Sequence, residues 1–356
     1  MKKLVGLAAA GLLTAGAVQA GNLTVANSDI VLYGGISAGA EYANTDLGAI
    51  NAQPRELPFR LYNVAIGLMK KADANNSPIG FNLAFAYFYV PTVVASADTV
   101  NEGNLIKLGT TNTFRPWLGY VTLAPVEGLS IDAGLLWAKY GEAPVTILNP
   151  HINRGVLFVH YNPVLFAGLR ANYSIEGLAD IYVGYNQGGG LFQGAPPAGR
   201  NIGDAVEAGV SFNLDALKVG LHMYDEAGGK NFYTLCVKTE VAGTKVGIQA
   251  SLATEDDAVK NNTTDDSSFG IAIFAQPQLT DTISIPVRVE YENTDDKTDD
   301  TILTLTVTPT WKPTANTFAR VEFAYASWKN KFAEIGSNSG GKDNRTVLAL
   351  EIGYLF

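Results

Sequence analysis

Charged side chains stand two residues apart in several segments of this chain that otherwise read as β-strands. Arg288 and Glu290 form one such pair, and Arg320 and Glu322 form a second. Alternate residues of a strand project from the same face, so each pair places opposite charges on one face. Such charges can set the ion preference of a water-filled passage, or each pair can be a structural ion pair that neutralises itself. The sequence leaves both interpretations open.

Three histidines, His151, His160 and His222, are the other side chains that could carry out chemistry. Nucleophilic catalysis needs a nucleophile beside a base that a third group orients. The sequence has no Gly-x-Ser-x-Gly elbow and no His-Glu-x-x-His pair. We therefore predict neither catalysis, nor a metal centre, nor a bound cofactor.

The charged pairs belong to segments with a two-residue alternation. Within 282–292, Ile283, Val287 and Tyr291 share one face, whereas Arg288 and Glu290 share the other. This alternation indicates strands with one apolar and one polar face. Sixteen segments fit a strand, and fourteen or eighteen are the alternative counts: 30–43, 59–71, 78–90, 112–124, 128–140, 163–176, 179–189, 203–214, 217–225, 231–241, 244–254, 267–276, 281–292, 301–311, 316–328 and 345–356.

The links between these segments alternate in length. Short links, such as 215–216, 242–243 and 277–280, follow the even-numbered segments. The links after the odd-numbered segments are mostly long, and only 226–230 is short among them. Short turns at one end and long loops at the other are typical of transmembrane β-barrels. We predict an all-β fold: one transmembrane antiparallel β-barrel domain over residues 21–356, with about sixteen strands.

Both ends of the chain indicate an exported membrane protein. Residues 345–356 alternate large apolar side chains with small or polar ones and stop on Phe356, which resembles the terminal strand of bacterial outer-membrane barrels. Residues 1–20 combine a basic start, an apolar stretch and a small-residue cleavage site. They are predicted to be a signal peptide rather than a transmembrane helix, because the apolar run is too short. The expected location is the outer membrane of a Gram-negative bacterium.

Composition agrees with this fold and excludes one class of partner. Hydrophobic residues make up 47% of the chain, yet the mean hydropathy is only +0.09, as one-for-one alternation requires. Removal of Lys2 and Lys3 with the signal peptide lowers the basic side chains from 25 to 23, against 34 acidic ones. This balance excludes a general nucleic-acid binder. The single cysteine, Cys236, allows no internal disulfide.

The third long link, 141–162, is the candidate functional segment. A barrel of sixteen strands is too wide for side chains to fill, so a water-filled channel results. The run Val156–Val159 is too apolar for an exposed loop. We predict that the link folds inward as a constriction loop; the alternative is an extra strand at 154–161. The predicted pore-lining and constriction residues are His151, Arg154, His160, Arg170, Arg288, Glu290, Arg320 and Glu322.

The ends of the segments carry two further signals. Acidic residues cluster in the links 255–266 and 293–300. They could bind a divalent cation, but no EF-hand spacing is present, which favours solvated loop tips. Aromatic residues near segment ends, such as Tyr140, Tyr224 and Trp328, predict girdles at the membrane interfaces.

Particular stretches resemble known porins. Residues 29–42 resemble the first strand of general Gram-negative porins. The middle of the chain, with Gly134–Gly141, Arg154-Gly155, Tyr161–Pro163 and Gly168–Tyr173, is similar to the OmpL-like β-barrel porin family. This resemblance implies a pore through the outer membrane and no catalytic residues. It also implies contact with outer-membrane lipid and lipopolysaccharide, passage of small hydrophilic solutes and, by analogy with sixteen-stranded porins, a homotrimer.

The expected function is a passive diffusion channel for small hydrophilic solutes or ions. The alternative is a non-conducting structural or adhesive barrel in the same membrane. The acidic excess predicts a weak cation preference, unless the arginines at 154, 170, 288 and 320 dominate the narrowest point. The transported solute does not follow from the sequence.

Overall fold

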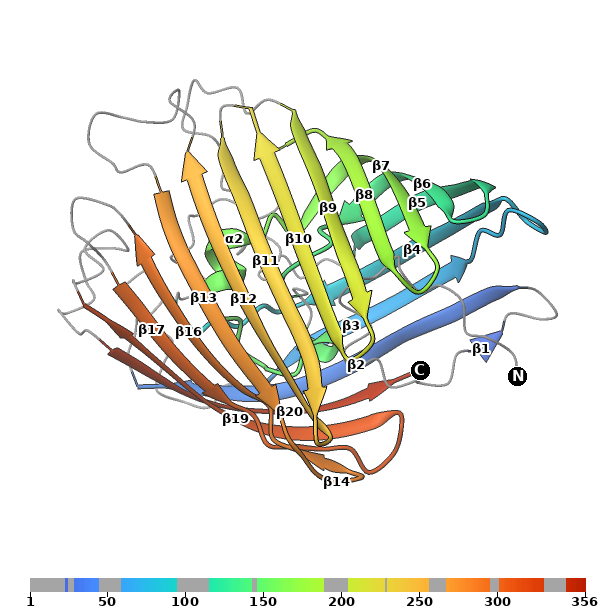
Figure 1. Cartoon of the computed structure of the whole chain (residues 1–356). Coiled ribbons are helices and arrows are strands. Elements are labelled where there is room, and N and C mark those ends of the chain that lie inside the picture. The colour runs from blue at the N-terminus through green and yellow to red at the C-terminus, as the bar shows by residue number, and fades with distance from the viewer. Residues whose placement is uncertain are drawn as a thin grey trace.

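The protein is a closed antiparallel β-barrel in this computed structural model (Figure 1). The structure describes residues 23–24, 29–44, 59–94, 115–142, 146–188, 204–227, 229–255, 267–294, 301–329 and 344–356. The predicted signal peptide lies outside this part, as do residues 256–266 and 295–300 of the two acidic links. Among the described helices, none has the length and apolarity needed to cross a membrane.

The described residues form sixteen barrel strands, each paired with the strand that follows it in the chain. The first eleven are unbroken: β2 (Ile30–Ala43), β3 (Phe59–Lys70), β4 (Ile79–Phe88), β5 (Arg115–Val126), β6 (Leu129–Trp137), β7 (Leu165–Ile175), β8 (Ala179–Asn186), β9 (Ala205–Leu214), β10 (Leu217–Glu226), β11 (Lys230–Val241) and β12 (Thr244–Glu255). A short segment, β1 (Leu23–Thr24), pairs with β2.

Prolines interrupt the next three strands, because proline cannot donate a ladder hydrogen bond. Their pieces are β13 (Ser267–Gln276) with β14 (Gln278–Thr280), β15 (Ile283–Ser284) with β16 (Val287–Thr294), and β17 (Thr301–Val307) with β18 (Thr310–Trp311). The last two strands, β19 (Thr317–Trp328) and β20 (Asn344–Leu355), are unbroken. β20 pairs with β2, and this pairing closes the barrel.

The predicted alternation of faces is confirmed. Leu348, Ile352 and Tyr354 of β20 are exposed on the outside of the barrel, and so are Val289 and Tyr291 of β16. The polar faces turn inward: Arg288, Glu290, Arg320, Glu322 and Glu351 are all buried. The predicted strand bounds agree with the structure to within a few residues. One short link was misplaced, since β14 covers 278–280 and the turn falls at Asp281–Thr282.

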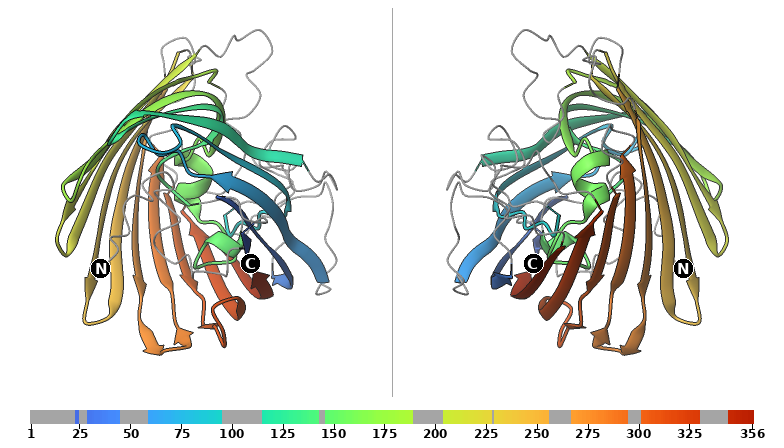
Figure 2. Two further views of the ribbon diagram at one scale, coloured as in Figure 1. Left: turned by 90° about the vertical axis from the view of Figure 1, so that its right-hand side faces the viewer. Right: turned by 90° about the vertical axis from the view of Figure 1, so that its left-hand side faces the viewer.

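The third long link carries two short helices that lie within the barrel (Figure 2). They are η2 (Thr146–Leu148) and α2 (Val156–Tyr161). We call residues 146–161 the strap. The predicted inward fold is therefore observed, and the alternative of an extra strand at 154–161 is wrong, because α2 occupies those residues.

Candidate functional site

Buried carboxylates on the inner wall hold the backbone of the strap. The Glu322 carboxylate on β19 accepts hydrogen bonds from the backbone N–H groups of Ile152 at 2.6 Å and Asn153 at 2.7 Å. It also accepts from the Asn153 side chain at 2.9 Å and from the Thr308 hydroxyl at 2.7 Å. A carboxylate that receives four donors fixes this part of the strap against the wall.

Glu290 on β16 holds the first turn of α2 in the same way. Its carboxylate accepts from the N–H groups of Val156 at 3.2 Å and Leu157 at 3.3 Å, and from the Thr304 hydroxyl at 2.8 Å. The first N–H groups of a helix lack intrahelical partners, so a carboxylate there is favourable. Gly155 makes the approach possible, because a Cβ atom at this position would lie only 1.7 Å from a Glu290 oxygen.

Arginines satisfy the carbonyl groups of the strap. Arg320 donates to the carbonyl oxygens of Asn149 at 2.6 Å and Thr146 at 2.9 Å, and pairs with Glu351 at 2.5 Å. Arg288 on β16 donates to the Asn153 carbonyl at 2.9 Å. The wall therefore offers carboxylates to the strap donors and guanidinium groups to the strap acceptors.

Arg154 and Glu142 complete the network from the link itself. Arg154 donates to the carbonyl oxygens of His151 and Ile152, the latter at 2.9 Å, and pairs with Glu142 at 3.4 Å. Glu142 also accepts from Arg288. The Glu142 side chain is 23% exposed, whereas the two arginines are almost fully buried.

The apolar side of α2 lies on a part of the wall with small side chains. Leu157, Phe158 and Tyr161 are buried, and Ala253 and Ala272 belong to the same apolar cluster. A Cβ atom at Gly270 of β13 would lie 2.9 Å from the Tyr161 ring and 3.0 Å from the Leu157 side chain. The absence of bulk at Gly270 lets the helix approach the wall and cover its apolar residues.

The two strap histidines occupy different environments. His151 Nδ1 lies 2.7 Å from the Thr308 hydroxyl, and burial together with Arg288, Arg154 and Arg320 holds the pKa of His151 well below its usual range. Glu322 lies 3.9 Å from the same nitrogen, but that distance is long and the burial dominates, so His151 is neutral. His160 Nδ1 lies 2.7 Å from Glu292, and its side chain is 32% exposed.

The structure thus brings together seven of the eight predicted site residues. Arg170 stands apart, because it pairs with Glu207 of β9 at 2.7 Å and donates to the Trp137 carbonyl at 2.7 Å. Sequence reasoning did not assign roles to Glu142, Glu292 and Glu351. Glu292 and Glu351 were visible as charged residues on polar strand faces, but nothing in the sequence marked them as partners of the strap.

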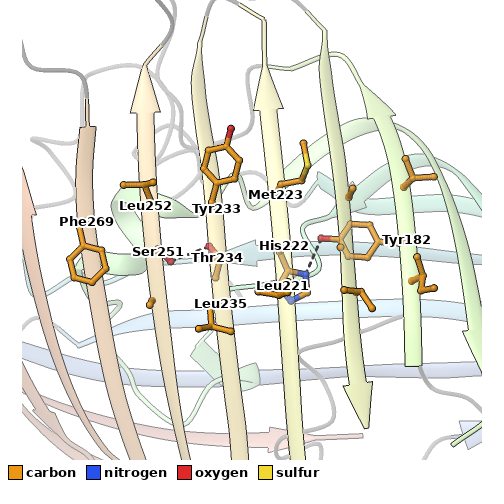
Figure 3. A pocket seen from close by; sticks show the side chains of 16 residues that line it. Tyr182, Leu221, His222, Met223, Tyr233, Thr234, Leu235, Ser251, Leu252 and Phe269 are labelled. Atoms are coloured by element: carbon orange, nitrogen blue, oxygen red, sulfur yellow. Dashed lines mark hydrogen bonds between the residues drawn. The ribbon is translucent and has the colours of Figure 1, made fainter. Parts of the chain in front are cut away.

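None of the strap hydrogen bonds described above involves the inner wall formed by β7–β11, which carries polar side chains beside the aromatic residues Phe166, Tyr224 and Phe232. The Tyr182 hydroxyl lies 3.1 Å from His222 Nδ1, and the Thr234 and Ser251 hydroxyls are 3.1 Å apart (Figure 3). The ring of Tyr140 stacks on His222 with 5.4 Å between the ring centres. We call the inward face of β7–β11 the facing wall.

The outer face of the same strands is apolar. A shallow depression on the outer face of β8–β13 includes the exposed side chains of Leu221, Leu235, Leu252 and Phe269 (Figure 3). Such a surface suits the hydrocarbon region of a membrane. This depression is therefore part of the lipid-facing surface and does not belong to the channel.

Two other predictions concern metal binding and aromatic residues. Within the described ranges, no cluster of three or more His, Cys, Asp or Glu residues could hold a metal ion. The girdle interpretation is wrong for Tyr140, Tyr224 and Trp328, because all three are buried in the inner apolar cluster that also contains α2. Strand parity places Tyr224 and Trp328 on inward faces, and Tyr140, beyond the end of β6, stacks on the inward-facing His222.

A closed sixteen-stranded antiparallel barrel with a strap inside its lumen defines a porin. The model of the family "Putative beta-barrel porin-2, OmpL-like" matches residues 31–356, and the chain belongs to this family. A search of curated proteins finds no match to the sequence.

Solved porin structures share the fold at low sequence identity. The chain is similar to OmpT of Vibrio cholerae, with a TM-score of 0.63 and 10% identity over 94% of this chain and 100% of that one. An anion-selective porin from Comamonas acidovorans gives a TM-score of 0.64 and 10% identity over 92% and 99% of the two chains. OmpF of Salmonella typhi in complex with daunomycin gives 0.63 and 13% over 94% and 100%.

Family and fold together establish the protein as an outer-membrane porin. It is a passive diffusion channel for small hydrophilic solutes or ions. Nothing in the fold or in the comparisons favours the alternative of a non-conducting barrel.

Proposed function

We propose that the strap is a fixed constriction and that solutes pass between it and the facing wall. One observation carries this proposal: Glu290, Glu322 and Glu351, on three different wall strands, each accept hydrogen bonds from the strap. These carboxylates are buried, and arginines on the wall donate to the strap carbonyls. A segment held at several points along its length narrows the lumen permanently and does not act as a gate.

The energetics of buried polar groups favour the docked strap. A hydrogen bond to a charged group contributes about 1.5–3 kcal/mol, and a buried charge that loses its partners costs more. Undocking would leave several carboxylates and guanidinium groups of the wall without their strap partners. The two strap histidines and the wall carboxylates are engaged in positioning the strap, so we propose passage of solutes without chemistry on them.

We also propose an export signal at residues 1–20 and a homotrimeric assembly, by analogy with sixteen-stranded porins. The apolar outer face supports contact with outer-membrane lipid and lipopolysaccharide. Native mass spectrometry of the purified protein tests the assembly, and a monomer in mild detergent would contradict it. N-terminal sequencing of the mature protein tests cleavage after Ala20.

Planar-bilayer recording of the purified protein tests the constriction. Stepwise currents with a steady level are expected, and a variant in which a short Gly-Ser linker replaces residues 146–161 should conduct more per step. A matched variant with the same linker in place of the turn residues 72–77 should conduct as the wild type does. Equal conductance in the strap variant and the wild type would contradict a constriction at the strap.

A further inference from the structure

Two lysines with like charge stand directly opposite each other on the facing wall. Lys218 of β10 pairs in register with Lys238 of β11. Both project inward, in the row next to Gly220 and Cys236. Like charges directly opposite each other on one face of a sheet are destabilising. A bound anion between the two ammonium groups would relieve this repulsion.

Among the described residues, no carboxylate forms a salt bridge with Lys218 or Lys238. Nearer the turn at the end of β11, Glu240 stands opposite Lys245 of β12. Lys218 is exposed and Lys238 is half-buried, so both ammonium groups reach the water of the lumen. The arginines of the strap network, in contrast, are already engaged with carboxylates and carbonyl groups.

His222 supplies a third donor above the lysine pair. Its ring lies over two glycines: a Cβ atom at Gly209 would be 2.7 Å from Nδ1, and one at Gly220 would be 2.6 Å from Nε2. The Tyr182 hydroxyl lies 3.1 Å from Nδ1. When the hydroxyl donates to Nδ1, the neutral ring carries its proton on Nε2. Nε2 lies above Gly220, which stands between Lys218 and His222 on the inward face of β10.

We propose that Lys218, Lys238 and His222 Nε2 form a binding site for the carboxylate group of a small organic anion that passes through the lumen. Two ammonium groups and one neutral donor match a carboxylate, which accepts at both oxygens. The absence of a side chain at Gly220 leaves room between the donors. This inference rests on the proposed path along the facing wall and names a class of solute for it.

The site lies near one end of the barrel, which the neighbouring turns identify. Lys218 follows the two-residue turn Asp215–Ala216, and Lys238 lies close to the turn Ala242–Gly243. Short turns mark the periplasmic end of outer-membrane barrels. The site therefore lies near the periplasmic mouth, where it would hold an anion that has already crossed the constriction.

Succinate is the probe for this site, and succinamide is its uncharged counterpart of the same shape. In planar bilayers with KCl, succinate should lower the current in a saturable way, whereas succinamide should not. The double variant Lys218→Gln/Lys238→Gln should bind succinate about tenfold or more weakly. Phosphate, added in a separate titration, shows whether the site takes any small oxyanion or prefers carboxylates.

The matched control is Lys70→Gln/Lys71→Gln, which removes the same charge from the same end of the barrel, where Lys70 pairs with Asp29 at 3.2 Å. This control should keep the wild-type response, and so should Lys238→Arg, which keeps the charge. Equal succinate affinity in both double variants would overturn the proposal. Calorimetric titration of the detergent-folded protein measures succinate binding without any current. Currents without calorimetric binding would contradict the site alone, whereas calorimetric binding without currents would contradict the channel.

Discussion

Replacement of Glu322 by Gln should loosen the strap without unfolding the barrel. The wild-type carboxylate accepts from the N–H groups of Ile152 and Asn153, at 2.6 and 2.7 Å. An amide keeps one acceptor oxygen but turns an NH2 donor toward the other N–H group. At least two charge-assisted hydrogen bonds are lost or weakened, at about 1.5 kcal/mol each, or about 3 kcal/mol in total. The docking equilibrium of this part of the strap should then shift by about a hundredfold.

Hydrogen exchange and conductance report this shift independently. Exchange of the amides at 151–153 should speed up by about the same factor, while the amides of β19 and β20 keep their protection. Single-channel current should become noisier, with excursions to higher levels. Glu127→Gln, in the exposed turn after β5, is the control and should leave both readouts unchanged. Unchanged protection at 151–153 in the Glu322 variant would refute the account of how the strap is held.

Three further predictions test the packing of α2, the strap histidine and the strand faces. Gly270→Leu should push α2 into the lumen and lower the single-channel conductance, whereas Gly119→Ala, with its nearest neighbour at 3.4 Å, should not. The lowered pKa of His151 means that the undocked strap binds more protons, so docking should weaken as pH falls below about 6.5, by up to about 1.4 kcal/mol per pH unit. Exchange measured against pH should show this slope in the wild type, and a His151→Asn variant with the same slope would contradict it. Leu252→Arg, on the lipid face, should cost about 2–4 kcal/mol in refolding into bilayers, whereas Gln249→Arg, which faces inward, should be tolerated.

The barrel could be predicted because its signals are local. Side-chain alternation identifies a strand and its two faces from the strand alone. The alternation of short and long links distinguishes the two ends of the barrel. Side-chain alternation and link length together predicted the number of strands. The breaks at Pro277, Pro286 and Pro309 were visible as residues, but the exact turn at Asp281–Thr282 depends on pairing with neighbouring strands. Tyr224 shows the limit of position-based reasoning, since the face it occupies matters more than its distance from a strand end.

The strap was predictable as a segment but not as a shape. The run Val156–Val159 required cover, and only the barrel interior offered it. That the run is helical depends on Glu290, far along the chain, which caps the first turn, and on Gly270, which leaves room for the helix. Contacts between residues more than a hundred positions apart leave no local trace in a single sequence. For the same reason, the hydrogen bonds from Arg320 to the carbonyl groups of Asn149 and Thr146 could not be assigned from spacing.

The structural interpretation of the charged pairs holds for Arg288 and Glu290, whose Nε and Oε2 atoms lie 3.3 Å apart, whereas Arg320 pairs with Glu351 and not with Glu322. Arg288 with Glu290, and Arg320 with Glu322, present a donor and an acceptor to a strap whose backbone lies along the wall. Their charges are therefore largely neutralised by one another and by the strap, and they should affect ion preference mainly through the position of the strap. Unpaired charge remains on the facing wall, at Lys218. Removing that charge should shift the reversal potential in a KCl gradient toward cations, with no change in exchange at the strap. The joint replacement Arg288→Met/Glu290→Gln should instead alter strap exchange more than selectivity. The opposite pattern would show that the strap network itself selects the ions.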